Sequence, residues 1–270
     1  MRSARIVIAS LACVVAVFGL NACTSKPIAP STGAIGYDAA KLPSGPVGDL
    51  IAYGRKIVMD TPAQAKPYIA ANMSCSACHI AGGTVANGGW LAVAANFPQY
   101  NKRAKRVIML QDRIAECFLY SMNGRPPAYN SREMIAVTAY ITWLSRGQHL
   151  FGKSDSTTKI LRHPAPAVVS VQNGAALYAQ KCSLCHQATG AGVSGTFPPL
   201  WGPTSFNNGA GMAKIPMMAG FVKVNMPQNK PGSLTWQEAY DVSAYVLSHP
   251  RPKFVKTKSI AFPPQASGFF

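Results

Sequence analysis

The 270-residue sequence has few charged side chains, few cysteines and no repetitive use of glycine or proline. Only 13% of the residues are charged and 48% are hydrophobic, a balance that excludes an intrinsically disordered chain. Its 23 glycines and 21 prolines show no period, which excludes collagen-like and low-complexity proteins. Seven cysteines are too few for a disulfide scaffold of this length. The length of 270 residues suggests about two domains. Positive charge is in excess, with 26 Lys and Arg against 9 Asp and Glu, and this favours an anionic partner.

The N-terminal segment predicts export. Two unpaired arginines precede a short apolar stretch at residues 6–20, which is typical of a secretory signal peptide rather than a membrane span or a twin-arginine signal. Residues 20–23, Leu-Asn-Ala-Cys, resemble a bacterial lipobox, so we expect residues 1–22 to be removed and Cys23 to be lipidated; plain cleavage nearby is the alternative. After Cys23 no apolar run approaches the ~18 residues of a membrane span. We therefore expect a periplasmic protein that is soluble or tethered through a lipid.

Two copies of the pattern Cys-x-x-Cys-His are the strongest signal in the chain, at residues 75–79 and 182–186. This pattern attaches c-type haem through two thioether bonds, and its histidine ligates the iron. Zinc binding or dithiol chemistry could explain one copy, but two copies behind an export signal favour haem. The sequence thus predicts two covalently bound haem c groups, held by Cys75, Cys78, Cys182 and Cys185, with His79 and His186 as iron ligands.

Similar sequence surrounds the two motifs. A helix is predicted before each, near residues 50–57 and 174–181, and an amphipathic helix ends each unit, at 131–145 and 235–248. Ser131 and Thr235 are the expected N-caps, and Glu238 completes a capping box with Thr235. Each closing helix has one apolar face, formed by Ala136, Tyr140 and Leu144 in the first and by Ala239, Val242 and Val246 in the second.

No segment alternates apolar and polar residues as a strand does, so the predicted fold class is all-α, with two cytochrome c-like domains each wrapped around one covalent haem. The predicted boundaries are 23–44 for a flexible tether, 45–150 for the first domain, 151–170 for a linker, 171–256 for the second domain and 257–270 for a C-terminal tail.

The second domain offers a methionine as the distal ligand of its haem. Met226 precedes Pro227 in a turn, a common way of presenting a thioether to haem, and Met ligation raises the reduction potential. The alternative is that Met226 packs in the core and that Met212, Met217 or Met218 binds the iron.

The first domain has no Met-Pro turn, although Met109, Met122 and Met134 are available. Its distinctive residue is Cys117, a cysteine outside both haem motifs, which follows five basic residues between positions 102 and 113. Arg106, Arg113 and Cys117 would share one face of an unbroken helix. A lone cysteine is often a small buried hydrophobe, and a basic run is usually a solvated face. Nucleic acid is a poor partner outside the cytoplasm, so an iron-ligating thiolate or a nucleophile fits better.

These features together resemble a known family over residues 45–255. The paired haem motifs, the Arg…Arg…Glu-Cys…Ser-Met-Asn-Gly segment at 103–124 and the Phe-Pro-Pro-Leu-Trp-Gly…Asn-Met-Pro pattern of the second domain are similar to dihaem thiosulfate dehydrogenases. Those periplasmic cytochromes couple two thiosulfates into tetrathionate, can also reduce tetrathionate, and pass electrons to an external acceptor such as a cytochrome c.

The resemblance also implies roles for individual residues. Cys117 matches the catalytic cysteine that ligates the first haem, and by spacing Arg103 and Arg113 match two arginines that support substrate. His186 and Met226 match the ligands of the second haem. Some relatives carry a ligand-switching lysine directly before that methionine; Asn225 stands there in this chain, so such a switch is not expected.

Two other functions fit the same motifs. A dihaem electron carrier without enzymatic activity would need Met122, Met134, His149 or His163 as the distal ligand of its first haem. A dihaem subunit of a sulfur-oxidation (Sox) complex would use a ligating cysteine but act with partner proteins. Assay of the isolated chain with thiosulfate separates both from a thiosulfate dehydrogenase.

Overall fold

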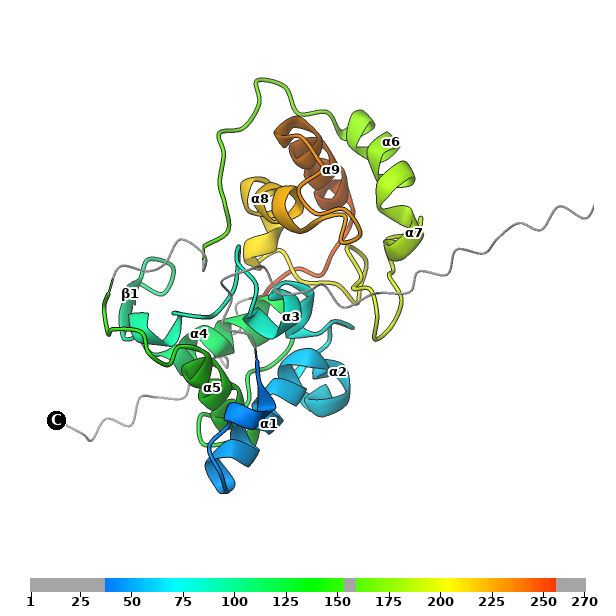
Figure 1. Cartoon of the computed structure of the whole chain (residues 1–270). Helices are drawn as coiled ribbons and strands as arrows, with labels where there is room; N and C mark the ends of the chain where they lie inside the picture. The colour runs from blue at the N-terminus through cyan, green and yellow to red at the C-terminus, as the bar shows by residue number, and fades with distance from the viewer. Residues whose placement is uncertain (1–36, 153–158, 256–270) are drawn as a thin grey trace, which may run out of the picture.

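The computed structural model describes residues 37–152 and 159–255 of the chain. Helices α1 to α5 form one half of this part and α6 to α9 the other (Figure 1). The first half contains α1 (Pro46–Met59), α2 (Thr61–Gln64), α3 (Ile80–Gly83), strands β1 (Gln99–Asn101) and β2 (Arg106–Ile108), α4 (Leu110–Glu116), a π-helix (Cys117–Ser121) and α5 (Arg132–Leu144). The second contains α6 (Val171–Lys181), α7 (Ser183–His186), α8 (Ile215–Asn225) and α9 (Trp236–Ser248).

The first half is organised by the packing of α1 against α5. Helix α5 begins where the sequence predicts, because the Ser131 hydroxyl accepts a hydrogen bond from the Met134 N–H. Its predicted apolar face, which includes Tyr140, is completely buried. Gly54 allows the close approach of the two helices, since a Cβ atom there would lie 2.0 Å from the Ala136 carbonyl oxygen.

The second half repeats this arrangement with α6 packed against α9, and α8 against α9 as well. A Cβ atom at Gly174 would lie 2.1 Å from the Asp241 carbonyl oxygen, so a glycine is again required where the first helix crosses the last. The predicted capping box is present, with Thr235 and Glu238 each bonding the other's backbone N–H. The sequence similarity around the two motifs is therefore a repeat of helix packing.

A short hairpin contradicts the expectation that the chain has no strands. Strands β1 and β2 pair in antiparallel register, with Gln99 opposite Ile108. The expectation of no strand is therefore wrong for this short hairpin. Arg106 lies in β2, and helix α4 begins only at Leu110. The prediction that Arg106 and Cys117 share one face of a helix is therefore wrong.

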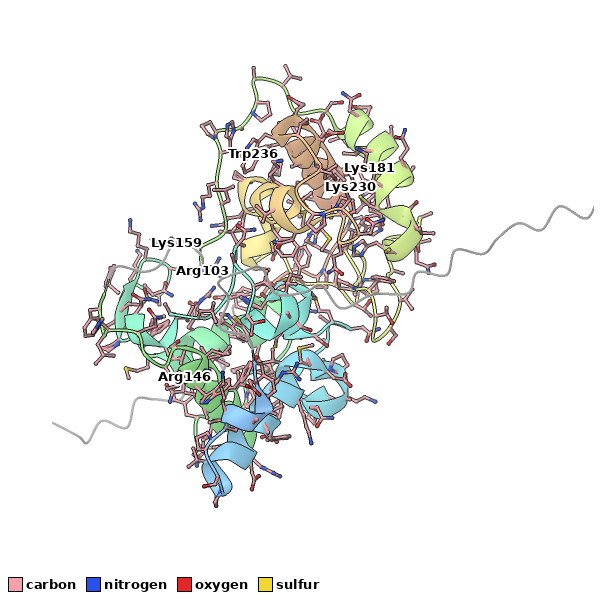
Figure 2. All side chains as sticks on the ribbon, viewed as in Figure 1. Arg103, Arg146, Lys159, Lys181, Lys230 and Trp236 are labelled. Atoms are coloured by element: carbon pink, nitrogen blue, oxygen red, sulfur yellow. The ribbon has the colours of Figure 1, made fainter. Side chains whose placement is uncertain are left out.

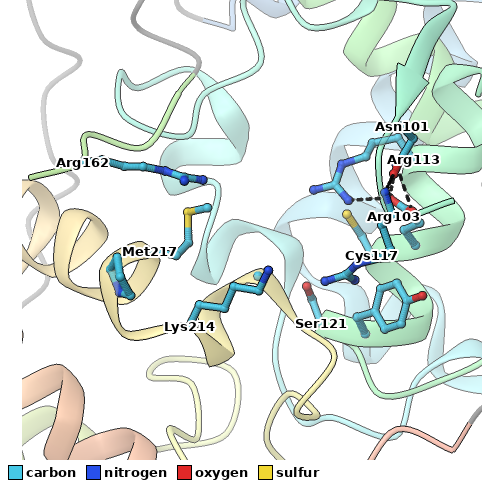
Figure 3. A pocket seen from close by; sticks show the side chains of 12 residues that line it. Asn101, Arg103, Arg113, Cys117, Ser121, Arg162, Lys214 and Met217 are labelled. Carbon is cyan, nitrogen blue, oxygen red and sulfur yellow. Dashed lines mark hydrogen bonds and ion pairs between the residues drawn. The ribbon is translucent and has the colours of Figure 1, made fainter. Parts of the chain in front are cut away.

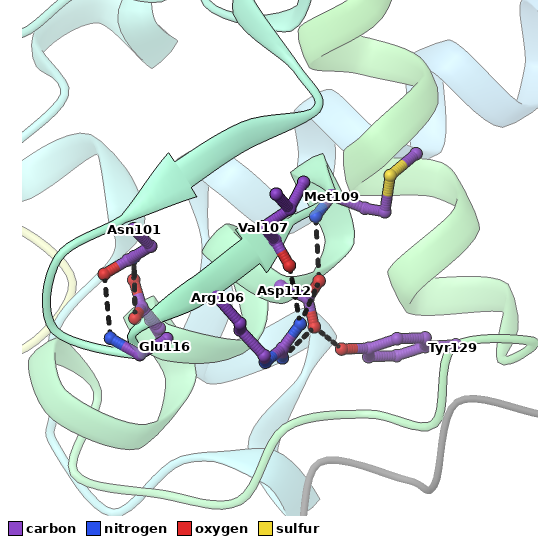
Figure 4. Close-up of polar contacts among 8 residues, drawn as sticks. Asn101, Arg106, Val107, Met109, Asp112, Glu116 and Tyr129 are labelled. Atoms are coloured by element: carbon purple, nitrogen blue, oxygen red, sulfur yellow. Dashed lines mark hydrogen bonds and ion pairs between the residues drawn. The ribbon is translucent and has the colours of Figure 1, made fainter.

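Asp112 explains why the helix begins there. Its carboxylate accepts the Met109 N–H at 2.8 Å, pairs with Arg106 at 2.8 Å and accepts the Tyr129 hydroxyl (Figure 4). Burial raises the pKa of Asp112, but these hydrogen bonds outweigh it and lower the pKa below its usual value. Arg106 therefore serves this buried network at the base of the hairpin.

The predictions for the two ends of the chain fall mainly outside the described residues. This holds for the signal peptide, for Cys23, for residues 23–36 of the tether and for the tail at 257–270. Within the described part of the tether, the Tyr37 ring contacts Trp143 at a centroid distance of 5.6 Å. No helix between residues 37 and 255, as far as they are described, has the length and apolarity needed to cross a bilayer.

Candidate active site

The first Cys-x-x-Cys-His motif forms a tight turn that aims its histidine inward. The His79 N–H bonds the Cys75 carbonyl at 3.0 Å, and the His79 ring lies 4.3 Å from the Trp90 ring. Burial lowers the pKa of His79 to about 4, so the imidazole is neutral at pH 7. Its Nδ1 lies 2.6 Å from the Gly88 carbonyl oxygen, which can only accept, so Nδ1 carries the proton and Nε2 keeps its lone pair for a metal.

The second motif has the same arrangement. The His186 N–H bonds the Cys182 carbonyl at 3.0 Å, and His186 Nδ1 lies 3.0 Å from the carbonyl oxygen of Pro198. Burial lowers the pKa of His186 as well. Each half therefore presents one neutral imidazole whose Nε2 is free to ligate iron, next to two thiols at the spacing of haem attachment.

Two orphaned donors support the fit of haem to these sites. Among the described residues, the buried side-chain nitrogens without any hydrogen-bond partner are Arg55 Nε and Asn225 Nδ2, one in each half. A buried donor without an acceptor is costly, so such atoms indicate a missing polar group. Haem c carries two carboxylates, which would supply acceptors. The donor set, the histidine tautomers and these orphaned atoms fit one haem in each half.

Cys117 opens the π-helix that follows α4. A π-turn inside a helix often marks a functional site, and here it closes with a bond from the Met122 N–H to the Cys117 carbonyl at 3.0 Å. Burial raises the pKa of Cys75 to about 11 and of Cys78 to about 12, and the neighbouring Cys117 sulfur contributes to both rises. Cys117 therefore lies within electrostatic range of the two attachment thiols of the first motif.

The charge state of Cys117 is not set by its basic neighbours alone. Burial raises the pKa of the Cys117 thiol, although the positive charge of Arg113 opposes this rise. The basic sequence before Cys117 thus does not by itself produce a thiolate. Coordination to a metal deprotonates a thiol outright, so iron ligation would provide what the arginine does not.

A pocket of about 330 Å³ lies over Cys117, between the two halves of the molecule (Figure 3). It brings together the three catalytic candidates Cys117, Arg103 and Arg113, as the sequence predicts for a single site. Figure 2 shows Arg103 at the junction of the two halves. The remaining lining residues are Asn101, Glu116, Tyr120, Ser121, Arg162, Gly211, Lys214, Pro216 and Met217.

The two predicted arginines are held in different ways. Arg113 pairs with Glu116 at 2.8 Å. The Glu116 carboxylate, whose side chain is 4% exposed, also accepts the Asn101 amide at 3.1 Å (Figure 4). Arg103 donates to the Gly209 carbonyl of the second half at 2.9 Å and stacks over the Tyr120 ring at 4.5 Å. The bond from Arg103 to Gly209 therefore exists only when the two halves pack together, whereas its contact with Tyr120 lies within the first half.

Comparison with known proteins identifies both halves. Residues 65–150 match the family model described as the SoxA/TsdA cytochrome c domain, and residues 171–250 match the cytochrome c model. A curated thiosulfate dehydrogenase from Allochromatium vinosum is 40% identical over 80% of this chain and 83% of its own length. One from Stutzerimonas stutzeri is 40% identical over 78% of this chain and 71% of its own. The chain belongs to the thiosulfate dehydrogenase family.

A solved structure of a member of this family has the same fold. The thiosulfate dehydrogenase TsdBA of Marichromatium purpuratum matches with a TM-score of 0.78 and 34% identity over 87% of this chain. The chain spans 54% of that protein's length. These matches confirm the predicted fold, two mainly helical cytochrome c domains, and the family that the sequence resembles.

Several residues that line the pocket were not predicted from the sequence to belong to it. Arg162 comes from the linker and Lys214 from the start of α8, as does Met217, which the sequence offered only as a ligand of the second haem. Nothing in their local sequence indicates a site, because they reach the pocket only through the packing of the second domain on the first. Met226, the predicted distal ligand, caps the C-terminal end of α8 and does not line this pocket.

Asn207 holds the two domains of this thiosulfate dehydrogenase family member together beneath the pocket. Its side chain is 1% exposed and donates to the Leu119 carbonyl at 2.8 Å and to Asn123 Oδ1 at 3.0 Å, while its own N–H bonds the Tyr120 carbonyl at 3.1 Å. The last carbonyls of a helix lack partners within the helix, and here the second domain provides them. Asn207 thus fixes the π-helix that begins with Cys117.

We expect Asn207→Leu to lower the free energy of unfolding by about 2–3 kcal/mol, because a buried acceptor left unbonded costs about 1–3 kcal/mol. Chemical unfolding followed by circular dichroism measures this change. Asn229→Leu is the matched control, since Asn229 is exposed. Equal unfolding midpoints in the two variants would contradict the role assigned to Asn207.

Proposed function

We propose that the chain is a periplasmic dihaem thiosulfate dehydrogenase that couples two thiosulfates to tetrathionate and releases two electrons to an external acceptor. The observation that carries this proposal is the pocket in which Cys117 lies with Arg103 and Arg113 at the junction of two cytochrome c domains. Membership of the thiosulfate dehydrogenase family supports the same reaction.

Two haem c groups are the proposed cofactors. Cys75, Cys78 and His79 would hold the first, and Cys182, Cys185 and His186 the second. Cys117 would be the distal ligand of the first iron and Met226 that of the second. When bound, each haem supplies a one-electron redox centre, so the pair matches the two electrons of the reaction.

The charges of the substrate explain why the site needs fixed arginines. Two dianions about 4 Å apart repel by about 16 kcal/mol at an effective dielectric constant of about 20, four times the figure for unit charges and an upper scale. Arg103 and Arg113 offset part of this repulsion. A guanidinium stays protonated and binds sulfonate-like oxygens with two parallel donors, which a lysine cannot do.

Cys117 lets the two thiosulfates react one after the other. In the first step the Cys117 thiolate and one thiosulfate form a sulfur–sulfur bond, giving Cys–S–S–SO₃⁻ and losing two electrons. In the second step the terminal sulfur of another thiosulfate attacks the middle sulfur of this adduct. The bond to Cys117 breaks, the thiolate leaves with the electron pair, and tetrathionate is released. The second step is a reversible exchange, which favours a site that also reduces tetrathionate.

The predicted export signal supports a location outside the cytoplasm, and the two released electrons require an external acceptor. The protein would act in the periplasm, tethered if Cys23 is lipidated, and a small redox protein such as a cytochrome c would accept the electrons. Nucleic acid is not a partner.

The test is an assay of the purified chain, loaded with haem, using thiosulfate as substrate and ferricyanide as electron acceptor. We expect tetrathionate to form at the rate at which ferricyanide is reduced. A plain electron carrier would show no turnover. A subunit that needs Sox partners would be inactive on free thiosulfate, so absence of turnover in the isolated chain would contradict the proposal.

We expect Arg103→Gln and Arg113→Gln each to lower kcat/KM for thiosulfate by roughly ten- to a hundredfold. The physical reason is the loss of one charge-assisted hydrogen bond, worth about 1.5–3 kcal/mol. Steady-state kinetics measure the effect, and unchanged haem spectra show that the cofactor sites are intact. Arg125→Gln is the matched control, because Arg125 is exposed and does not line the pocket. Normal kinetics in both pocket variants would show that these arginines do not bind the substrate and only form a solvated surface.

A further inference from the structure

The wall of the pocket that faces Cys117 carries its own positive charges. Arg162 from the linker and Lys214 from the start of α8 extend toward the cavity from the side opposite Cys117 (Figure 3). Within residues 37–152 and 159–255, neither side chain forms an ion pair with an acidic group. Both are exposed, so their charges are available to a ligand.

The backbone that carries these two side chains is fixed. The Leu161 N–H donates to Asn87 Oδ1 in the first domain at 2.5 Å. The Leu161 carbonyl oxygen packs so closely against Gly220 of α8 that a Cβ atom added to this glycine would lie 1.8 Å from it. The linker is thereby held between the first domain and α8. The Lys214 carbonyl accepts the Met218 N–H at 3.0 Å in the first turn of α8. Arg162 and Lys214 therefore belong to the built wall of the pocket.

Charge balance favours a role for this wall. On the Cys117 side, Glu116 neutralises one of the two charges of Arg103 and Arg113, which leaves a net charge of about one. The adduct on Cys117 and an incoming thiosulfate together carry three negative charges. Adding Arg162 and Lys214 brings the positive charge of the pocket to the same magnitude.

The direction of attack favours the same two residues. Exchange at a sulfur–sulfur bond proceeds by attack on one sulfur while the other leaves. The attacking sulfur must come from the side opposite the leaving Cys117 sulfur. In this pocket that side is the wall of Arg162 and Lys214.

We propose that Arg162 and Lys214 bind the sulfonate group of the second thiosulfate, the one that attacks the Cys117 adduct. This inference rests on the proposed function. In the reverse direction the same residues hold the thiosulfate that leaves when the Cys117 thiolate attacks tetrathionate. Arg103 and Arg113 hold the sulfonate of the first thiosulfate, so tetrathionate spans both walls.

Binding measurements test this division of the pocket without turnover. In haem-loaded Cys117→Ala protein, calorimetry with tetrathionate and with thiosulfate as separate probes would compare Arg162→Gln and Lys214→Gln with the Arg125→Gln and Lys253→Gln controls, which alter exposed residues outside the pocket. We expect each pocket variant to lower the affinity for tetrathionate about tenfold or more, because the variant loses a charge-assisted contact. The first thiosulfate should bind about as in the parent protein.

Kinetics in the protein with Cys117 intact provide an independent measurement. The concentration of thiosulfate at half-maximal rate should rise about tenfold in each pocket variant, and further in the double variant, but stay unchanged in the controls. Pocket variants that match their controls in both measurements would overturn the proposal. If the parent protein binds tetrathionate in this pattern but does not oxidise thiosulfate, the anion site stands and the proposed function fails.

Discussion

Replacing Cys117 with alanine is expected to abolish thiosulfate oxidation while both haems stay covalently attached. The substitution leaves the attachment thiols and the histidines of both motifs unchanged, so haem loading should be unaffected. The reaction loses the sulfur that carries the first thiosulfate, and removal of a covalent nucleophile commonly lowers kcat by about a thousandfold or more. The measurement is ferricyanide reduction with thiosulfate, normalised to covalent haem content.

The spectrum of this variant separates the two roles of Cys117. Loss of a thiolate ligand changes the ferric spectrum of one haem and raises its reduction potential, while the second haem keeps its spectrum. The matched control is Ser121→Ala, which alters the same pocket without touching the thiol. A Cys117→Ala protein that oxidises thiosulfate at the parent rate would refute covalent catalysis and leave the electron carrier as the better interpretation.

Local chemistry made much of this molecule predictable. The caps at Ser131 and Thr235 are short-range signals, and the helices that they start lie where the sequence places them. The haem motifs are short-range as well, because two thiols and a histidine within five residues need only one turn of backbone. Cys117 was recognised because it belongs to neither motif.

The remainder depended on contacts between distant residues. The break before α4 depends on Asp112 binding Arg106 and the Tyr129 hydroxyl, a network that helical periodicity cannot reveal. The facing wall of the pocket depends on how the linker and α8 dock on the first domain, so Arg162 and Lys214 carried no signal. The candidate residues of the first domain, which line one pocket, were named from sequence, but the shape of the complete pocket required the interface between the two domains.

The surroundings of Met226 decide which side chains can reach the second haem. Lys223, the nearest lysine before it, donates to the carbonyl oxygens of Gly232 at 2.9 Å and Leu234 at 2.6 Å, so its ammonium is already bonded. Asn225 is buried with its amide nitrogen unbonded, and an amide is a weak ligand for iron. This geometry favours Met226 as a permanent ligand, without a lysine that replaces it.

The other methionines near α8 are less suited to this role. Met218 is 6% exposed and packs in the hydrophobic core, and Met217 lines the pocket on the side of the first domain. Met226, half-buried at the end of α8, is directly followed by a proline that prevents the helix from continuing. We therefore expect Met226 to be the thioether ligand and the reason that the second iron has the higher potential.

Replacing Met226 with leucine should lower the reduction potential of the second haem by tenths of a volt, since axial ligands set haem potentials over a range of about 0.8 V. Leucine keeps the apolar volume and removes only the sulfur donor. Spectroelectrochemical titration measures the potential, and the ferric thioether-to-iron absorption band should disappear. Transfer to an external cytochrome should slow, because the driving force from the thiolate-ligated centre to this one is lost, while tetrathionate binding at the pocket should be unchanged. Met217→Leu is the matched control; if that variant loses the band and Met226→Leu keeps it, Met217 is the ligand and the assignment of Met226 is wrong.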